Sequence, residues 1–314
     1  MKRLVSILLA LAVCAALVAV VWANGGSETI TVVSDTSVMV YGPLASYAGL
    51  GDAVWGAPQS AVATWVHSSW PSISGATWIS TSYWIGDDGG SVPDSSWRWF
   101  TKSVDLCPGA YNIAGTITAT SDNAEDVYVN GTWVDSDGEV QDPWEDNHEW
   151  GTIIDYPFTV SSADTLNLDF IVRNYPGNSA PTANPTGLIF KAVITYDCPI
   201  QVTIDIKPGS DPNCFNSDGH GVIPVAILGS ADFDASTVDP STVSLDGADV
   251  RVKGKSGNAG ALEDVNGDGF LDLVVQITDE GGYGIGDTMA TLEGLTYDGV
   301  PIVGSDSICI RPPE

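Results

Sequence analysis

Oxygen-bearing residues follow one another at short spacing in the segment EDVNGDGFLDLVVQI. Counted from its first Asp, the side chains occupy positions one, three, five and nine, and a backbone carbonyl falls at position seven. In proteins, Ca²⁺ takes roughly six to eight oxygen ligands, often from one loop wrapped round the ion. Three carboxylates this close would also repel one another without a cation. We therefore predict a calcium site, with an empty acidic turn as the alternative; its ligands would be Asp264, Asn266, Asp268, the Phe270 carbonyl and Asp272.

This segment differs from the helix-flanked loop of an EF-hand. Its twelfth position holds Val275 where an EF-hand has a bidentate Glu. The residues from Leu271 to Ile277 also read as a β-strand. The pattern resembles the strand-flanked, Asp-rich loops of integrin-type repeats, where the ninth-position Asp completes the ion shell. The resemblance implies an ion that fastens its domain, and Glu263 or Asp279 could supply a further oxygen.

Aromatic residues form the second group with chemical potential. Eight tryptophans between positions 70 and 150 are too many for one core, and Trp144 and Trp150 stand in the polar segment QDPWEDNHEW. Sugar-binding sites commonly set an aromatic ring against a pyranose and let Asp or Asn bond the hydroxyls, although an exposed indole suits a protein partner too. We predict that Trp144 and Trp150 line a ligand surface, with Asp122 and Asn123 as polar partners. The alternatives are structural tryptophans and a strand-end turn at the two polar residues.

Catalytic motifs are sparse. His67, His148 and His220 are the three histidines, and HEWGT lacks the second His that a zinc motif places four residues on. KGKS is not a P-loop, because the position five before Gly254 holds Asp249. A Gly-x-Ser-x-Gly elbow is absent, and nothing singles out a glycosidase pair among 40 acids. We expect a protein that is not an enzyme and has no catalytic residues.

The N-terminus reads as a secretory signal peptide. Lys2 and Arg3 precede an apolar run from Leu4 to Val21, and we expect cleavage after Ala23, so that residues 1–23 are removed. The alternative is a retained anchor, since a spanning helix needs about 20 apolar residues. No second apolar run follows. We therefore expect an extracellular protein, secreted or associated with the cell surface, without a membrane span after signal cleavage.

The charge balance restricts the partners. Without the two basic residues of the signal peptide, nine Lys and Arg face 40 Asp and Glu, a net charge of about −31. A nucleic-acid partner is excluded on this basis, because phosphate binding needs a basic face. Only nine of the acids are Glu, so the acidity belongs mostly to loops and caps. Solubility and divalent cations both account for it.

The chain divides into two predicted domains. Every tryptophan of the mature chain precedes position 151, and Pro199 interrupts two alternating strands in TYDCPIQVTIDIKPGSDPN. We place the domains at residues 27–197 and 201–314. Four cysteines remain after processing, which allows three disulfide connectivities. One bridge within each domain is the simplest pairing, and bridges between domains are the alternative; the residues are Cys107, Cys198, Cys214 and Cys309.

Apolar residues recur with period two, and no stretch of a dozen residues shows helical spacing. In WRWF the two indoles therefore face one side of a strand and Arg98 and Phe100 the other. The segment YVNGTWV predicts a hairpin with an Asn-Gly turn, and we prefer this to the reading of Asn130 as a glycosylation site. The fold class we predict is all-β, with two antiparallel β-sandwiches of jelly-roll or immunoglobulin-like type.

Two segments, ITATSDNAEDVYVNGTWV and LNLDFIVRNYPGNSAPTANPTGLIFKAVITYD, resemble the galactose-binding-like jelly-roll modules of secreted and surface proteins. In such modules they form a hairpin with an Asn-Gly turn and the closing strands. The resemblance covers about half of the first domain. It implies binding of carbohydrate or of another surface ligand in many members, whereas other members only support a neighbouring domain.

The second domain resembles a C-terminal module of exported bacterial and archaeal proteins. The segments that carry the resemblance are, in order, IDIKPGSDPN, GVIPVAILGSADFDASTVDPSTV, EDVNGDGFLDLVV and GLTYDGVPIVGSDSICI. It covers nearly the whole domain, and it implies an exported context without a defined activity.

Together these features predict a secreted calcium-binding protein with a non-catalytic, adhesion-type function. Its partner would be a carbohydrate or another ligand of the cell surface or extracellular matrix. The first alternative is a structural subunit that self-assembles into an extracellular layer or filament. The second is a glycoside hydrolase-type enzyme.

Overall fold

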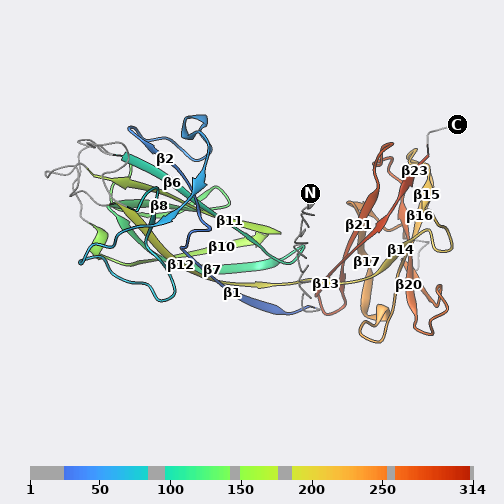
Figure 1. The fold of residues 1–314 in the computed structure, drawn as a ribbon. Helices are drawn as coiled ribbons and strands as arrows, with labels where there is room; N and C mark the ends of the chain where they lie inside the picture. The colour runs from blue at the N-terminus through green and yellow to red at the C-terminus, as the bar shows by residue number, and fades with distance from the viewer. Residues whose placement is uncertain (1–24, 84–95, 142–148, 176–185, 253–258, 312–314) are drawn as a thin grey trace, which may run out of the picture.

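The computed structural model describes residues 25–83, 96–141, 149–175, 186–252 and 259–311 (Figure 1). Within these ranges the chain forms strands and short 3₁₀ turns without an α-helix, so the prediction of an all-β fold is confirmed. No helix of the described residues is long and apolar enough to cross a membrane. The predicted signal peptide lies outside the described residues.

The first sandwich consists of two six-stranded sheets. Its first sheet runs in the order β10 (Ile154–Ser162), β7 (Tyr111–Asp122), β12 (Gly187–Asp197), β5 (Ile79–Ser80) and β4 (Val62–Ala63), and β1 (Ser27–Val33) also pairs with β12. Its second sheet runs in the order β3 (Gln59–Ser60), β2 (Met39–Leu44), β6 (Ser96–Asp105), β11 (Thr165–Asn174), β8 (Ala124–Val129) and β9 (Thr132–Asp137).

Alternation along the long strands builds the core between these two sheets. Leu188, Phe190 and Ala192 of β12 are buried in it, and the ring of Phe190 stacks on Phe170 of β11 with centroids 4.6 Å apart. Burying a side chain of this size contributes roughly 1.5–3 kcal/mol. The sheets are therefore held face to face by apolar side chains that are two residues apart in sequence.

The segment WRWF in β6 has the predicted two faces. Phe100 belongs to the core between the sheets, and Arg98 is fully buried on the same side of the strand. Trp97 and Trp99 belong to a separate apolar cluster on the other side, where the ring of Trp99 stacks on Tyr41 at 4.2 Å.

The predicted hairpin joins β8 to β9. Asn130 and Gly131 have φ values of 49° and 74°, which is the left-handed pair that a tight Asn-Gly turn requires. The carboxamide oxygen of Asn130 accepts a 2.8 Å hydrogen bond from the backbone N–H of Asn167 in β11. The turn is thereby fixed to its own sheet.

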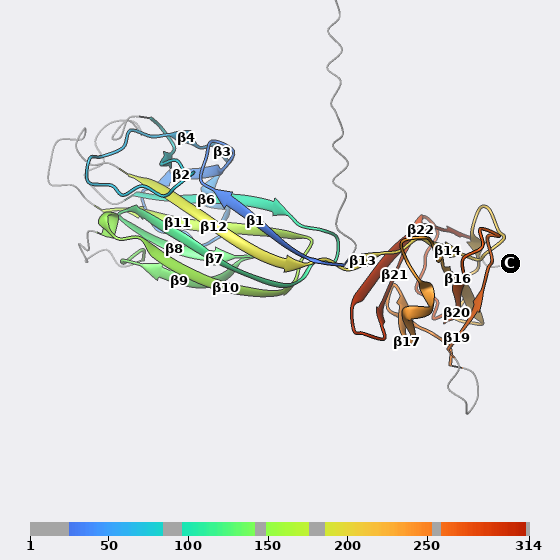
Figure 2. The ribbon, with the colours of Figure 1, turned by 90° about the horizontal axis from the view of Figure 1, so that it is seen from below.

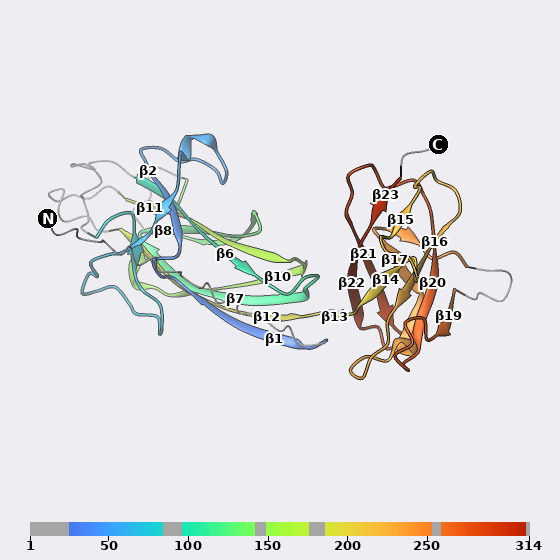
Figure 3. The same cartoon turned by 45° about the vertical axis from the view of Figure 1, so that its right-hand side comes forward.

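The second sandwich contains a five-stranded and a four-stranded sheet, with a short parallel pair at the end that lies near the C-terminus (Figure 3). The five-stranded sheet runs in the order β13 (Ile200–Gln201), β22 (Pro301–Ser307), β21 (Met289–Thr296), β17 (Val238–Leu245) and β18 (Ala248–Asp249). The four-stranded sheet runs in the order β14 (Ile204–Ile206), β16 (Val222–Ile227), β20 (Asp272–Thr278) and β19 (Gly260–Glu263), and the pair is β15 (Cys214–Phe215) with β23 (Cys309–Ile310).

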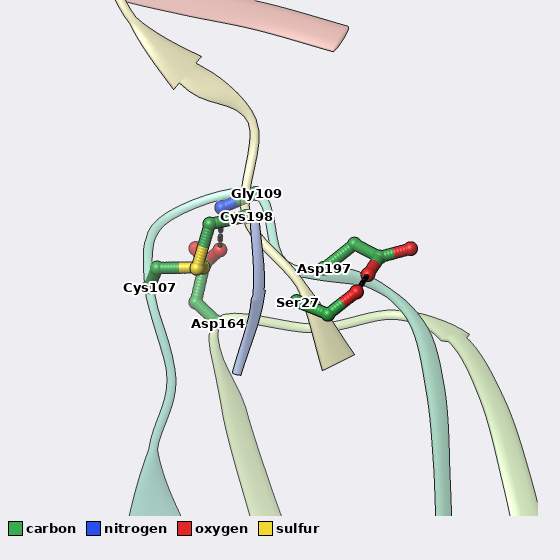
Figure 4. The surroundings of a disulfide bond; sticks show 6 residues. All are labelled: Ser27, Cys107, Gly109, Asp164, Asp197 and Cys198. Carbon is green, nitrogen blue, oxygen red and sulfur yellow. Dashed lines mark hydrogen bonds between the residues drawn. A yellow bond between two sulfur atoms is a disulfide. The ribbon is translucent and has the colours of Figure 1, made fainter. Parts of the chain in front are cut away.

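Two disulfides have the connectivity that we considered simplest. Cys107 is bonded to Cys198 at the end of the first sandwich, and Cys214 to Cys309 between β15 and β23. Figure 4 shows the first bridge, beside which the Asp164 carboxylate accepts a 2.7 Å hydrogen bond from the N–H of Gly109. The strand pairings of the described residues stay within one sandwich or the other, while their independence as domains stays a prediction. Disulfides of this kind are typical of exported proteins.

Replacing both Cys107 and Cys198 with Ser should lower the free energy of unfolding of the first sandwich by about 4 kcal/mol, because the bridge closes a loop of 91 residues. Urea unfolding followed by tryptophan fluorescence measures this, since all tryptophans precede β13. The matched control replaces Cys214 and Cys309, which are 95 residues apart. It should leave the fluorescence transition in place if the sandwiches unfold independently, and an equal shift in both variants would contradict that independence.

Candidate functional site

Five of the eight tryptophans that the structure describes are bonded within the protein through their indole N–H groups. The rings of Trp70 and Trp78 stack at 4.2 Å in an apolar cluster with Ile73 and Ile189, on the outer face of the first sheet. Their indole N–H groups, like those of three other tryptophans, donate hydrogen bonds of 2.7–2.9 Å within the protein. The other three donors and their acceptors are Trp55 to the Gly49 carbonyl, Trp97 to the Val140 carbonyl and Trp99 to the Asp169 carboxylate.

The predicted polar partners of a ligand, Asp122 and Asn123, are 4% and 5% exposed. The carboxylate of Asp122 accepts a 2.7 Å bond from the indole of Trp70. Asn123 donates its backbone N–H to the carbonyl of Arg173, and its side-chain oxygen accepts from the N–H of Tyr175 at 2.7 Å. These bonds are those of a buried strand-end turn, the alternative given above. Their role as polar partners of a ligand stays a prediction.

The two predicted aromatic ligand contacts have different outcomes. Trp144 lies outside the described residues. Trp150 belongs to the 3₁₀ turn η2 (Glu149–Gly151) and is half-buried. Its ring approaches His67 edge-on at 6.1 Å, and His67 in turn approaches Trp65 at 5.8 Å. His67 is half-buried, and Trp150 also packs against the apolar cluster that contains Trp70 and Trp78.

The acidic segment of the second sandwich forms a turn bonded to itself. Both carboxylate oxygens of Asp264 accept backbone N–H groups, from Gly267 at 2.8 Å and Gly269 at 3.1 Å. Asp268 accepts from the N–H of Phe270 at 2.9 Å, and the phenyl ring of Phe270 is partly exposed. The amide NH₂ of Asn266 donates to Asp268 at 3.0 Å. The carboxamide oxygen of Asn266 accepts the N–H of Asp268 at 3.0 Å.

Asp272 is the one buried carboxylate of this segment. It accepts the N–H of Gly229 and the N–H of Val265, both at 2.8 Å, and so joins two loops. Within the described ranges, no three His, Cys, Asp or Glu side chains are grouped to hold a metal ion. The bonds present are those of the acidic turn, and calcium at the five predicted ligands stays a prediction.

Two buried ionisable side chains, Arg98 and Glu125, lie on the inner face of the second sheet. Val172 of β11 pairs with Arg98 on one side and with Glu125 on the other. Glu125 is fully buried and accepts hydrogen bonds from the hydroxyls of Ser121 and Tyr156. Burial raises the pKa of Glu125 to about 8 and lowers that of Arg98 to about 10. Both side chains are buried inside the sandwich, so we assign them to its structure and not to a ligand site.

An open groove runs along one side of the same sandwich, where the edge strands β9 and β10 lie side by side (Figure 2). Its volume is about 460 Å³. Trp133 of β9 forms one wall, with its indole 54% exposed. Phe158 and Val160 of β10 turn towards the core and help to form an apolar floor. The full lining is Val129, Asn130, Thr132, Trp133, Val134, Pro157, Phe158, Thr159, Val160 and Ser161.

The polar groups of this groove are uncharged. They are the hydroxyls of Thr132, Thr159 and Ser161 and the carboxamide of Asn130. All four residues are exposed. An exposed ring beside uncharged hydrogen-bonding groups can hold a flat ligand that has both an apolar face and hydroxyls. Sequence reasoning missed this groove, although TWVDSD sets Trp133 among polar residues directly after the turn.

No family model matches the chain, and no curated protein matches it. Among solved structures, a β-glucuronidase from Ruminococcus gnavus in complex with D-glucuronic acid matches with a TM-score of 0.28 and 10% identity, over 92% of this chain and 46% of that one. A GH2 β-galacturonidase from Eisenbergiella tayi bound to galacturonate matches with a TM-score of 0.28 and 8% identity, over 91% and 44%.

These matches correct the predicted function. The matched proteins are glycoside hydrolases, where the sequence predicted a secreted, non-catalytic, calcium-binding recognition protein. That prediction is therefore wrong as stated. The chain spans less than half the length of the matched enzymes, and at these TM-scores and identities their activities and substrates are not carried over to it.

The calcium prediction has a direct test in Asp268→Ala. If the loop binds the ion, this variant should lose about 2.7 kcal/mol of stabilisation at a calcium concentration about 100 times the dissociation constant, and differ from wild type much less in EDTA. Differential scanning calorimetry in both solutions measures it. The matched control is Asp234→Ala, which removes another exposed Asp that caps a turn in the same sandwich. Equal losses for Asp268→Ala in calcium and EDTA would establish a turn without an ion.

The raised pKa of Glu125 predicts a pH-dependent stability. The folded pKa, about 8, exceeds the ordinary value of 4.5, so the folded chain holds a proton that the unfolded chain releases between these values. The free energy of unfolding should fall as the pH rises from 5 to about 8. Glu125→Gln keeps an acceptor oxygen and should reduce this slope in urea unfolding series. A remainder should persist from Asp122 and Asp126, because burial raises their pKa values to about 7 and about 6. An unchanged slope in the variant would remove Glu125 as the cause.

Proposed function

We propose that the first sandwich binds a saccharide in the groove between β9 and β10, with Trp133 stacked on the sugar ring. This function differs from the one predicted from the sequence, because it uses other residues and requires no calcium. The observation that carries it is the exposure of Trp133. The five tryptophans with indole bonds described above are packed in clusters or bonded inside the protein, whereas Trp133 is 54% exposed beside a groove.

The dimensions and lining support this assignment. A volume of about 460 Å³ is within the usual range of about 300–1,000 Å³ for small-ligand sites. A sugar ring offers an apolar face to an indole and hydroxyls to the groups around it. The resemblance of the first domain to galactose-binding-like modules favours the same class of ligand.

Binding without catalysis is what the groove itself supports. General acid and base catalysis of glycoside hydrolysis needs carboxyl groups on both sides of the bond to be broken. None of the ten lining residues has a carboxyl, imidazole, thiol or amine side chain. The proposed role is therefore retention of a saccharide at this surface.

Trp133→Ala should weaken saccharide binding at least tenfold. Covering about 100 Å² of indole contributes about 2.5 kcal/mol, and about 1.4 kcal/mol corresponds to a factor of ten. A polysaccharide panel in affinity electrophoresis identifies a ligand of the wild type, and isothermal titration calorimetry gives the ratio. Trp133→Phe should keep part of the affinity.

Trp65→Ala is the matched control, because Trp65 is also exposed in the first sandwich and does not line the groove. Its affinity should equal that of the wild type. Substitution of exposed residues usually changes stability by no more than about 0.5 kcal/mol, so circular dichroism should show both variants folded. The proposal fails if folded wild type retains no polysaccharide, or if Trp133→Ala binds as tightly as wild type.

A further inference from the structure

We infer that the groove selects neutral saccharides and rejects those with carboxylate groups on the ring. This inference rests on the proposed function and adds the substrate class. The matched enzymes have the opposite kind of ligand, since those structures contain glucuronic acid and galacturonate.

The first argument is the absence of a cationic partner. Proteins hold carboxylates with Arg, Lys or clusters of backbone N–H groups. None of the lining residues is basic. Of the four Lys and Arg residues in the described part of the first sandwich, Arg98 and Arg173 are buried, and Lys102 of β6 contacts Asp35 at 3.8 Å. Lys191 of β12 is separated from β10 by the strand β7 and does not line the groove. A uronate in the groove would thus lose hydration without gaining an opposite charge.

The second argument is the negative charge on the strands beyond the groove lining. Asp135 follows Trp133 by two residues on β9, and Asp155 precedes Pro157 by two residues on β10. Both are exposed. The carboxylate of Asp155 accepts a 2.6 Å hydrogen bond from the hydroxyl of Thr118 on β7. Asp135 directly follows the lining residue Val134 on β9, where its charge repels an acidic ligand.

The third argument is the hydrogen-bonding capacity of the four polar groups. The Asn130 oxygen already accepts a bond from Asn167, so its NH₂ group is left to donate. The hydroxyls of Thr132, Thr159 and Ser161 can each donate and accept. Sugar hydroxyls also donate and accept, whereas a carboxylate only accepts. These groups can therefore bond the hydroxyls of a neutral sugar both as donors and as acceptors, whereas their acceptor oxygens find no donor on a carboxylate.

The experiment compares one polysaccharide in two forms. A neutral polysaccharide retained by the wild type is oxidised selectively at its primary alcohols, which turns part of its hexose units into uronates and leaves the backbone unchanged. Affinity for the oxidised form should be at least tenfold lower at about 20 mM salt, and the difference should shrink at about 500 mM salt because exposed charges are screened.

Thr159→Lys provides the converse variant, since it adds a cation to the exposed face of β10. This variant should bind the oxidised polysaccharide more tightly than the wild type does. The control is Thr116→Lys, which adds the same charge on the neighbouring strand β7 outside the groove lining. It should bind the oxidised polysaccharide less tightly than Thr159→Lys does. Equal or tighter binding of the oxidised form by wild type would overturn the inference and leave the proposed function intact. Retention of neither form would overturn the proposed function itself.

Discussion

The packing of two sheets through one face each is the constraint on which the first sandwich depends. Phe170 and Phe190 stack across this interface, and the inner positions of the long strands follow them. Because only one face of each sheet is used in this way, the outer faces would be left apolar and exposed. Trp70 and Trp78 cover the first sheet, and Trp97 packs with Trp55 on the second. Trp55, Trp70, Trp78, Trp97 and Trp99 thus belong to two additional apolar layers outside the core.

The sequence contained the local rules of this fold. Period-two alternation predicted the strands, the Asn-Gly pair predicted the turn after β8, and the alternation in WRWF predicted that its two pairs of residues face opposite sides. Each of these depends on neighbours within a few positions. The cysteines alone left three connectivities open, and the structure was needed to pair them.

The candidate site could not be predicted in the same way. Asp122 is bonded to Trp70, which lies 52 residues away in the sequence, so its burial is a tertiary effect. The groove needs β9 and β10 to lie together although they belong to different sheets. The spacing of residues in the sequence does not predict that these two strands lie side by side. Exposure of Trp133 could have been anticipated from its polar neighbours, but the second wall of the groove could not.

The acidity of the chain has a local physical basis as well. Asp234 caps a 3₁₀ turn by accepting the N–H of Ser236, Asp239 accepts that of Ser241, and Asp264 accepts two such groups. A short carboxylate satisfies turn amides that the strands leave unpaired. Asp is therefore favoured over Glu in a protein made of many short strands, whatever ions surround it.

The open side of the first sandwich has one more consequence. β9 and β10 are each the last strand of their sheet, and unpaired edges invite the addition of strands from other molecules. Pro157 is exposed on β10 and has no N–H to offer to such a strand, while β9 carries Asp135 and Asp137. A proline and two carboxylates at these edges disfavour edge-to-edge pairing with another molecule, and this limits the aggregation hazard of an apolar surface that stays open.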